Sequence, residues 1–484
     1  MSKPIQGSKA VDSVQQRFAD YTKNLSYSDL SPEAIHSAKL RTIDSLGVLI
    51  AGFFGVPART ARNVAAAMPS SRGATIIGTR MKTTPDMAAF VNATTARAVE
   101  FNDLYHWPGS RTGHPSDVIT PVLAVAEHAQ LGGRDYLLGV VLAYEIYCRM
   151  CDAVQYNMSI DNTNFSTLGV SLAAGKLLGL TPEQLAHSVS MAAVPNVILN
   201  QVRGDHKTHY KVAAAGHAGR AGVFAALLAQ AGMEGPHLPF EGKAGYRAHA
   251  MQGKLDLAEM GGKAVRFKIM DARTRHRPAM GETHAAILAA EKLCGKFGAV
   301  KDVQSIRVET HKRAHELVGN RELSWCWAPQ TVESANQSIP YLVAAALLEG
   351  TITTRSVDAA HLANQDIRTL MTKIDVVENA EFTKLFNKKV LDDHPLLNSH
   401  DRLPSEHWAR IIVTTGDGRQ HSAETGGDID DLSVQKKDDQ IDAKFRMLTE
   451  DVLGSKRVNS ILDRLWHMED MKQVACIPRA FVIA

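Results

Sequence analysis

The sequence predicts a mainly α-helical protein in which both ends of the chain form one large all-helical domain beside a smaller α+β domain. The chain has 484 residues, which is more than one hydrophobic core usually supports. Helical patterns run from about residue 31 to 235, strand-like alternation begins near Lys263, and helical patterns return after residue 425. We therefore expect boundaries at 1–263, 264–425 and 426–484, with the last segment packing back on the first.

Helix-start patterns mark the first part of the chain. Ser31 stands in the N-cap position before Pro32, which suits the first helical position. Thr181 and Pro182 repeat this arrangement. Segments such as GVSLAAGKLLGL and AGHAGRAGVFAALLAQAG are rich in alanine and glycine. Small side chains let helices approach closely, so these segments predict a buried bundle.

The middle of the chain mixes strand and helix patterns. KAVRFKIM at 263–270 and VQSIRVETH at 303–311 alternate apolar and polar residues, as half-buried strands do. Between them ETHAAILAAEKLCGKFG predicts a helix that ends at a glycine. WARIIVTTGDGRQHSAE predicts a hairpin that turns at Gly416–Gly418. A helical tail follows, with the sequence DDQIDAKFRMLTEDVLGSKRVNSILDRLWHMED.

Composition and charge argue against several classes of function. The net charge is +3 and no long run of lysine or arginine occurs, so we expect no nucleic-acid partner. Five cysteines, few for the length and odd in number, suit a reducing compartment. The first residues are polar, and no stretch approaches the roughly 20 apolar residues of a membrane span. We therefore expect a soluble cytoplasmic protein without a membrane partner.

The first cluster of reactive side chains lies in VEFNDLYHWPGSRTGHPSDVITPVLAVAEH, residues 99–128. His114 precedes a helix that Ser116 or Asp117 can cap, so it lies beside backbone N–H groups that favour anions. A nearby carboxylate can orient the ring, and a neutral histidine there can abstract or return a proton. The alternative is a capped helix start with a solvated loop.

The second cluster, QVRGDHKTHYKVAAAGHAGRAG, is basic and leads into a helix of small residues. Lys211 is the last charge before an apolar run, so burial can lower its pKa and make it an acid or a base. The spacing of His206 and His209 also suits a pair of metal ligands. Neighbouring cations, including Arg203 and Lys207, would repel a metal ion, so we expect no metal site. The alternative is a solvated basic face.

The third cluster opens the second domain. Its basic residues are Arg273, Arg275, His276, Arg277 and His284. His284 stands near a predicted helix start, where backbone N–H groups favour an anion. The alternative is that His284 is an ordinary residue of the first helical turn.

Cysteine and glycine patterns leave cofactor chemistry without support. Cys148 and Cys151, with the distant Cys294, suggest an iron–sulfur cluster as one alternative. AYEIYCRMC nevertheless has the pattern of an amphipathic helix, without glycine or proline to shape a cluster loop, so we interpret these cysteines as structural. No G-x-G-x-x-G follows a strand, and neither a P-loop nor a G-x-S-x-G motif occurs. We expect no cofactor.

Together the three clusters resemble the MmgE/PrpD family, whose members include 2-methylcitrate dehydratase and cis-aconitate decarboxylase. The resemblance covers most of the chain. Its best pieces, in order, are EFNDLYHWPGSRTGHPSD, AAGKLLGLTPEQLAHSVSMA, KVAAAGHAGRAGVFAALLAQAG, FEGKAGY, VRFKI and THAAILAAEKL. It implies a helical domain built from both chain ends, a smaller α+β lid domain, a homodimer, and an active site between the domains that needs no metal.

The resemblance implies four catalytic residues. Asp103 matches the acidic segment before the HPS motif, His114 matches its histidine, and Lys211 matches the lysine before the small-residue helix. THAAILAAEKL places the lid histidine at His284, whereas counting from FKI, as in the dehydratase branch, places it at His276. We favour His284. For substrate binding we expect Glu100, His106, Arg203, Lys207, Arg275 and His276.

Some positions depart from the family pattern. Leu104 stands where threonine is frequent, and Glu100 replaces an aspartate. NMSIDNTNFSTLG lacks a histidine that decarboxylase-like members carry, which weakens that reading. We therefore expect a hydro-lyase that resembles 2-methylcitrate dehydratase and removes water from a small 2-hydroxy tricarboxylate by acid–base catalysis. The alternatives are a cis-aconitate decarboxylase-like lyase, an epimerase or isomerase of a small dicarboxylate, and a binding protein without catalysis.

Overall fold

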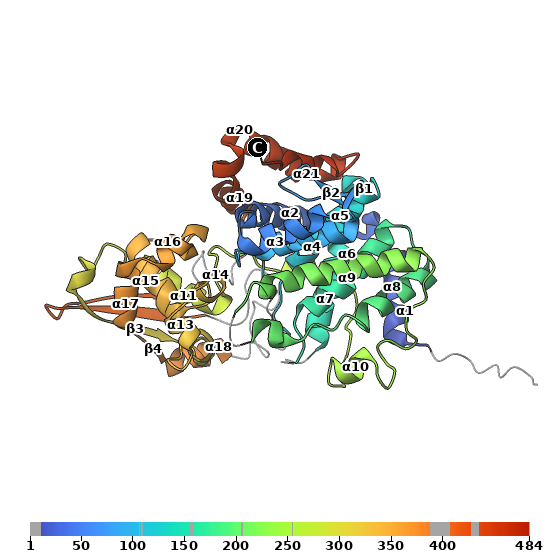
Figure 1. The fold of residues 1–484 in the computed structure, drawn as a ribbon. Helices are drawn as coiled ribbons and strands as arrows, with labels where there is room; N and C mark the ends of the chain where they lie inside the picture. Colours follow the sequence, from blue (N-terminus) through green and yellow to red (C-terminus); the bar gives the residue numbers. More distant parts are fainter. Residues whose placement is uncertain are drawn as a thin grey trace, which may run out of the picture.

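The computed structural model describes residues 11–105, 107, 110–154, 159–204, 207–253, 255–387, 407–426 and 435–483. Buried apolar residues form two large clusters in this part of the chain. The larger cluster draws on residues from Val14 to Ala272 and again from Ile441 to Phe481. The second cluster lies between Ala279 and Val413. Figure 1 shows the corresponding helical region and sheet region side by side along the molecule.

The helical region is a bundle in which residues from both parts of the chain share one core. Its first ten helices are α1 (Ser13–Asn24), α2 (Pro32–Gly52), α3 (Val56–Ala66), α4 (Pro85–Arg97), α5 (Ile119–His128), α6 (Gly133–Ala153), α7 (Thr163–Leu177), α8 (Pro182–Ala193), α9 (Tyr210–Gln230) and α10 (Tyr246–His249). Three more follow the sheet region: α19 (Asp438–Leu453), α20 (Ser455–Trp466) and α21 (Cys476–Ala480).

The predicted helix starts at Ser31 and Thr181 are confirmed. Ser31 Oγ accepts a hydrogen bond from Ala34 N–H at 3.2 Å, with Pro32 in the first turn of α2. Thr181 Oγ1 accepts one from Gln184 N–H at 3.2 Å at the start of α8. Each cap satisfies a backbone donor that the helix itself leaves free.

Helix α9 explains the richness of the chain in small residues. It packs against α4 and α7, and a Cβ at Gly216 would lie 2.1 Å from Thr94 Oγ1. A Cβ at Gly222 would lie 2.7 Å from the Thr167 carbonyl oxygen. Glycine therefore allows three helices to meet closely. By length and composition α9 is apolar enough to cross a membrane, but 61% of its most apolar stretch is buried inside this bundle.

The last helices lie on the first ones. Helix α19 packs along α2, and Lys444 of α19 forms a buried ion pair with Asp44 of α2 at 2.6 Å. Lys444 Nζ also donates to the Phe101 carbonyl oxygen at 2.9 Å. Figure 1 shows the C-terminal helices in red beside α2 and α3. These contacts tie the C-terminal segment to the beginning of the first cluster of reactive residues.

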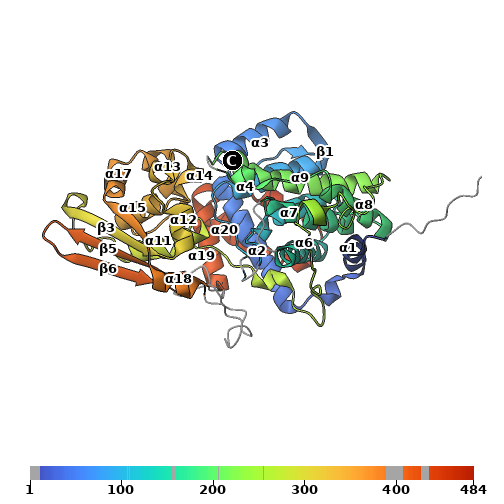
Figure 2. The same ribbon diagram turned by 90° about the horizontal axis from the view of Figure 1, so that it is seen from below.

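The sheet region places helices on a four-stranded sheet. The strands are β3 (Val303–Thr310), β4 (Ile374–Glu378), β5 (Ala409–Thr415) and β6 (Gln420–Thr425), in the order β4-β3-β5-β6. The helices are α11 (His284–Glu291), α12 (Lys312–Val318), α13 (Ser324–Trp327), α14 (Val332–Ala335), α15 (Ile339–Glu349), α16 (Ala359–Leu362), α17 (Gln365–Thr372) and α18 (Ala380–Asn387). Helix α11 contacts β5 and β6, and α15 contacts β4, as Figure 2 shows from below.

Several predicted elements of the sheet region are confirmed. The strand over 303–311 is β3, and the helix after residue 282 begins at His284 as α11. The hairpin is confirmed as β5 and β6, which pair antiparallel around Gly416–Gly418, with a positive φ of 84° at Gly418. Strand β4, parallel to β3, was not predicted.

The strand predicted over 263–270 is wrong. This segment ends in a 3-10 helix, Lys268–Asp271, that packs on α6. Glu145 of α6 replaces a neighbouring strand as hydrogen-bond acceptor, because its carboxylate accepts from Gly261 N–H and from Lys268 N–H, each at 2.7 Å. A buried side chain therefore satisfies the Lys268 backbone donor that the alternating pattern assigned to a sheet, together with the N–H of the nearby Gly261.

The helical region also contains a small β-ribbon, so the expectation of an all-helical domain needs correction. Strand β1 (Pro69–Thr75) pairs antiparallel with β2 (Lys82–Thr83). Glu127 of α5 accepts from Thr75 N–H at 2.8 Å and from Thr75 Oγ1 at 2.6 Å, which holds the ribbon on the bundle.

Candidate functional site

A pocket of about 240 Å³ lies where the helical region meets the sheet region. Six lysine or arginine side chains and two glutamates line it in the described part of the chain, which gives it an excess of positive charge: Arg111, Arg203, Lys207, Lys211, Arg275, Arg313, Glu100 and Glu282. We call Glu100, His114, Lys211 and Arg275 the inner wall. We call Glu282, Arg313, Leu317 and Trp325 the outer wall.

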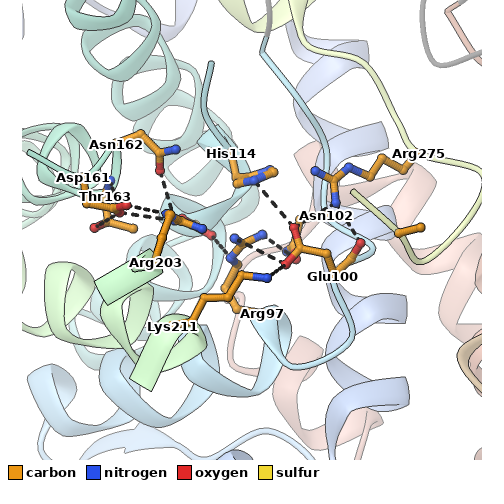
Figure 3. Close-up of polar contacts among 12 residues, drawn as sticks. Arg97, Glu100, Asn102, His114, Asp161, Asn162, Thr163, Arg203, Lys211 and Arg275 are labelled. Carbon is orange, nitrogen blue, oxygen red and sulfur yellow. Dashed lines mark hydrogen bonds and ion pairs between the residues drawn. The ribbon is translucent and has the colours of Figure 1, made fainter. Parts of the chain in front are cut away.

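Glu100 is the centre of the inner wall. It follows α4, and its backbone has a φ of 50°, a conformation that costs a non-glycine residue about 1 kcal/mol or more. Glu100 Oε2 accepts from Lys211 Nζ at 2.9 Å, and Oε1 accepts from Arg275 Nη1 at 3.0 Å. Arg97 Nη2 lies 4.0 Å from Oε2. Figure 3 shows these cations converging on one carboxylate.

The charge of Glu100 depends on these neighbours. Burial alone would raise the pKa of this carboxyl, since only 4% of the residue is exposed. Lys211, Arg97 and Arg275 outweigh burial and hold the pKa of Glu100 well below its usual range. Glu100 is therefore a fixed anion at neutral pH.

The ammonium group of Lys211 has a lowered pKa. It lies in the first turn of α9, with 3% of its side chain exposed. Burial lowers its pKa to about 8, while Glu100 raises it and Arg203 lowers it further. The lowering predicted from its place before an apolar run is thus confirmed. A pKa this close to neutrality lets Lys211 lose and regain a proton during turnover.

His114 presents one ring nitrogen toward Glu100. Its Nδ1 lies 2.8 Å from the Asp103 carbonyl oxygen, which can only accept, so Nδ1 carries the proton. Its Nε2 lies 3.9 Å from Glu100 Oε1. Burial, Arg97 and Arg275 hold the pKa of His114 well below its usual range. The ring is therefore neutral at pH 7, with Nε2 available as a proton acceptor.

Asp103 lies behind His114 and outside the pocket lining. It is fully buried, and Oδ1 accepts from Ser116 N–H at 3.0 Å while Oδ2 accepts from Tyr144 Oη at 3.0 Å. Its backbone carbonyl orients the histidine ring. The structure therefore gives Asp103 a positioning role through its backbone and keeps its carboxylate away from the pocket.

The expected cap of the helix after His114 is wrong. Neither Ser116 nor Asp117 places a side-chain oxygen on a helix-start N–H group. His114 itself occupies the N-cap position of a short 3-10 helix, Pro115–Val118, that leads into α5. The carboxylate of Asp103 accepts the Ser116 N–H instead, so the acceptor comes from the preceding segment.

Residues of the second predicted cluster line the pocket and also contact the residues behind it. Arg203 ends a 3-10 helix, Asn200–Arg203, and forms an ion pair with the buried carboxylate of Asp161. Lys207 lines the pocket, where its Nζ donates to the Arg203 carbonyl oxygen at 2.5 Å and lies 5.2 Å from the ring centre of Trp325. Lys207 thus reaches between the two regions of the molecule. His206 lies outside the described residues.

The third predicted cluster contributes Arg275 to the pocket lining but neither histidine. Arg275 reaches Glu100 because its segment pairs with the first cluster, through hydrogen bonds of 2.7 Å in both directions between Leu104 and Arg273. His284 is buried at the start of α11, and its Nε2 lies 3.1 Å from the Ala279 carbonyl oxygen. It stands just behind the lining segment 280–282. His276 is partly exposed and does not line the pocket, and His106 lies outside the described residues.

Other pocket residues were missed by sequence reasoning. They include Arg111, Thr112, Asn162, Asn200, Arg313, Gln337 and His407. Arg111 and Thr112 stand just before His114 in the first cluster, and Asn162 belongs to NMSIDNTNFSTLG, which was singled out only for its lack of a histidine. Arg313 and Leu317 are four residues apart on α12, so their side chains share one helix face. No motif in the sequence marks the remaining residues.

A buried arginine and carboxylate lie beneath the inner wall. Arg97, 1% exposed, donates to Asn102 Oδ1 at 3.2 Å, and its Nε lies 3.4 Å from Asp117 Oδ1. Burial raises the pKa of Asp117 to about 7, although Arg97 lowers it. Arg97 therefore adds positive charge close to Glu100 and His114 from a position that solvent does not reach.

The cysteines lie in hydrophobic surroundings. Cys148 and Cys151 are buried in α6, and burial holds the pKa of both thiols well above the usual value. Across the described ranges of the chain, no group of three or more histidine, cysteine or acidic side chains is arranged to hold a metal ion. Burial of Cys148 and Cys151 within α6 agrees with structural roles for the two side chains.

Comparison with known protein families assigns most of the chain. The MmgE/PrpD N-terminal domain matches residues 16–258, and the MmgE/PrpD C-terminal domain matches residues 278–468. The chain belongs to the MmgE/PrpD family. Arg275, which lines the pocket, lies in the short segment between the two matches.

Named relatives in the MmgE/PrpD family are lyases of two kinds. Cis-aconitate decarboxylase from Homo sapiens is 24% identical over 96% of this chain and 94% of the relative. A probable 2-methylcitrate dehydratase from Saccharomyces cerevisiae is 24% identical over 80% of this chain and 76% of the relative. A 2-methylcitrate dehydratase from Escherichia coli O157:H7 is 25% identical over 64% of this chain and 66% of the relative.

Proposed function

We propose that this member of the MmgE/PrpD family is a lyase, and specifically a hydro-lyase that removes water from a small 2-hydroxy tricarboxylate such as 2-methylcitrate. The observation that carries the proposal is the inner wall, where a neutral His114 and a Lys211 with a pKa of about 8 both face Glu100. The dehydratases among the relatives support this choice of reaction.

The charge of the pocket supports a polycarboxylate substrate. Six cationic side chains line the pocket against two glutamates in the described residues. Arginine can hold a carboxylate through two parallel N–H bonds, and lysine acts as a point charge. Leu104, Met280, Leu317 and Trp325 supply apolar lining, which suits a short alkyl substituent such as a methyl group.

In the proposed reaction His114 is the general base. Nε2 of the neutral ring takes a proton from the carbon beside a substrate carboxylate, and the Asp103 carbonyl stabilises the resulting imidazolium through Nδ1–H. The electron pair of the broken C–H bond forms the double bond. Glu100 lies 3.9 Å from Nε2, so its negative charge favours protonation of His114 as the reaction proceeds.

Lys211 is the general acid of the same step. Its ammonium group donates a proton to the departing hydroxyl, so that the C–O bond breaks with loss of water and not of hydroxide. A pKa of about 8 leaves Lys211 mostly protonated at pH 7 and makes it a stronger acid than an ordinary lysine. Each proton transfer of this kind typically contributes about 10²–10⁴-fold to the rate. Return of the proton from His114 to Lys211 completes the cycle.

We also propose that the sheet region acts as a lid. Its outer-wall residues Glu282, Arg313 and Trp325 line the pocket together with residues of the helical region. Movement of this wall onto the substrate would exclude water and strengthen the electrostatic contacts of the inner wall. The proposed lid corresponds to the expected segment 264–425.

Decarboxylation of cis-aconitate is the second candidate. The human decarboxylase matches this chain over nearly the whole length of both proteins, whereas the Escherichia coli dehydratase covers about two thirds. Decarboxylase-like members of the family carry a histidine in the segment before α7, and this chain does not. Asp161 and Asn162 stand there and hold Arg203. This difference favours dehydration. Proton abstraction by His114 also suits an epimerase, and a silent binding protein would use the cations alone.

One experiment separates these functions. Purified protein is incubated in deuterated water with 2-methylcitrate, citrate or cis-aconitate, and products are followed by ultraviolet absorbance and NMR. The proposed hydro-lyase forms an alkene with loss of water from 2-methylcitrate. Release of carbon dioxide from cis-aconitate would replace the proposal by the decarboxylase. Deuterium exchange without elimination would indicate an epimerase, and binding without any reaction would contradict catalysis.

A further inference from the structure

Arg111 is a buried arginine on the pocket whose charge no carboxylate of the described chain balances. The residue is 6% exposed. Within residues that the structure describes, its Nε and Nη1 atoms have no hydrogen-bond partner. Its Nη2 atom reaches Asn200 Oδ1 at 3.5 Å, which is longer than an ordinary hydrogen bond. Asn200 is a neutral amide, so the guanidinium charge is not neutralised there.

The other pocket arginines differ in this respect. Each holds a carboxylate of the protein: Arg275 holds Glu100, Arg203 holds Asp161, and Arg313 holds Glu282. An arginine stays protonated in proteins, and burying an unpaired charge with unused donors is costly. Arg111 therefore stands out as a buried cation without a carboxylate partner among the described residues.

The backbone on both sides of Arg111 is fixed. Arg111 N–H donates to the Cys151 carbonyl oxygen at 2.9 Å, near the end of α6. The next residue, Thr112, accepts from Asn162 Nδ2 at 3.1 Å, and Tyr105 and Gly113 close the segment by a pair of backbone hydrogen bonds. The backbone that carries Arg111 is thus held beside the pocket by the bundle before any ligand binds, which limits the backbone entropy lost on binding.

We propose that Arg111 binds a carboxylate of the substrate through its guanidinium group. Nη1 and the second hydrogen of Nη2 form a fork that matches two carboxylate oxygens. This inference rests on the proposed function, because it takes the pocket to be the site of a polycarboxylate. It adds a substrate contact outside the inner and outer walls, on the segment between Tyr105 and His114.

The first test measures binding without turnover. Propane-1,2,3-tricarboxylate has three carboxylates and no hydroxyl group to eliminate, so calorimetry with the full chain reports its Kd directly. Arg111→Gln is expected to weaken binding about 10- to 100-fold, as for removal of one partner of a buried charge pair. Arg111→Lys, which keeps the charge and loses the fork, is expected to weaken it less. Arg59→Gln, on the exposed face of α3, is the matched control and should bind like the wild type.

The second test shows whether the contact is direct. The same proteins are titrated with the central and the terminal monoamides of propane-1,2,3-tricarboxylate. For the monoamide that replaces the carboxylate held by Arg111, wild type and Arg111→Gln should bind equally, within about twofold. A merely structural role would weaken the binding of all three ligands by the same factor and would overturn the proposal.

Thermal unfolding shows whether a loss of binding in a variant comes from a folding defect. Without ligand, Arg111→Gln is expected to melt no lower than the wild type, because it removes a buried unpaired charge. If Arg111→Gln does not fold, Arg111→Lys takes its place, and wild-type affinity in a folded Arg111→Lys variant contradicts the fork. Tight binding by the wild type with no loss in Arg111→Gln would reject Arg111 alone. A wild-type protein that binds none of the ligands would reject the polycarboxylate site, and Arg111 with it.

Discussion

The inner and outer walls of the pocket differ in how their charges are held. On the inner wall Glu100, Lys211 and Arg275 have side chains only 2 to 4% exposed, and one carboxylate serves both cations. On the outer wall the Arg313 side chain is 32% exposed and forms an ion pair with Glu282. Burial shifts pKa values strongly on the inner wall, where His114 and Lys211 are both affected. In the proposed function, proton transfer therefore belongs to the inner wall and the outer wall contacts the substrate.

The largest expected effect comes from the two proton-transfer residues. His114→Ala and Lys211→Ala should each lower kcat/KM for the substrate by about 100-fold or more, the range for a lost general acid or base. Steady-state kinetics measure this, with circular dichroism to confirm folding. His467→Ala and Lys456→Ala, both on the exposed surface of the C-terminal helices, are matched controls. A folded variant with near-normal activity would remove that residue from the mechanism.

Two glutamate variants, one on each wall, test whether the walls differ in how much their ion pairs stabilise the fold. Glu100→Gln leaves Lys211 and Arg275 as buried cations without their carboxylate and should lower the free energy of unfolding by about 3 kcal/mol or more. Glu282→Gln breaks a partly exposed pair with Arg313 and should cost about 1 kcal/mol or less. Urea unfolding of both variants gives the difference. Equal losses would show that the two walls do not differ in this way.

Substitution of the two candidate lid histidines should change different kinetic parameters. His284 is buried behind the pocket lining, so His284→Ala is expected to lower kcat about tenfold by disturbing the segment 280–282. His276 is partly exposed on the arginine-rich segment, and His276→Ala should mainly raise KM, by a few fold. The opposite pattern would show that counting from FKI gives the correct lid histidine.

The smallest expected effect is on the apolar part of the outer wall. Leu317 is 36% exposed and shares a helix face with Arg313, so Leu317→Ala should raise KM a few fold and leave kcat unchanged. Comparison of 2-methylcitrate with citrate sharpens the test, because loss of an alkyl contact affects only the methylated substrate. A lower kcat for both substrates would place Leu317 closer to the chemistry than the comparison allows.

Patterns of neighbouring residues predicted the helix caps, one helix, one hairpin and the lowered pKa of Lys211. The caps at Ser31 and Thr181, the α11 helix, the β5–β6 hairpin and the lowered pKa of Lys211 all follow from residues near each other in sequence. These features depend on hydrogen bonds within a turn or on the apolar run beside a charge. Such interactions can be inferred from spacing alone.

Long-range contacts could not be predicted in this way. Glu100 meets Lys211 across 111 positions and Arg275 across 175, and nothing near Glu100 in the sequence marks it as a shared anion. The segment at 263–270 alternates like a strand, yet Glu145 of a distant helix accepts the hydrogen bond of the Lys268 N–H. Asp103 has the residue type of a catalytic acid, but its carboxylate faces Tyr144 and Ser116. The burial and partners of each side chain decided these outcomes.

The pH dependence of kcat/KM tests most directly the claim that Lys211 is the acid of the inner wall. With a folded-state pKa of about 8, Lys211 is protonated below pH 8 and loses its proton above it, so activity should fall along an alkaline limb near pH 8. Protonation of His114 should give an acid limb well below the pH at which an ordinary histidine titrates, because burial and nearby arginines lower its pKa. In Lys211→Arg the side chain stays charged, so the remaining activity should lack the limb near pH 8. An unchanged limb in Lys211→Arg, or a wild-type rate that is flat to pH 10, would contradict the assignment.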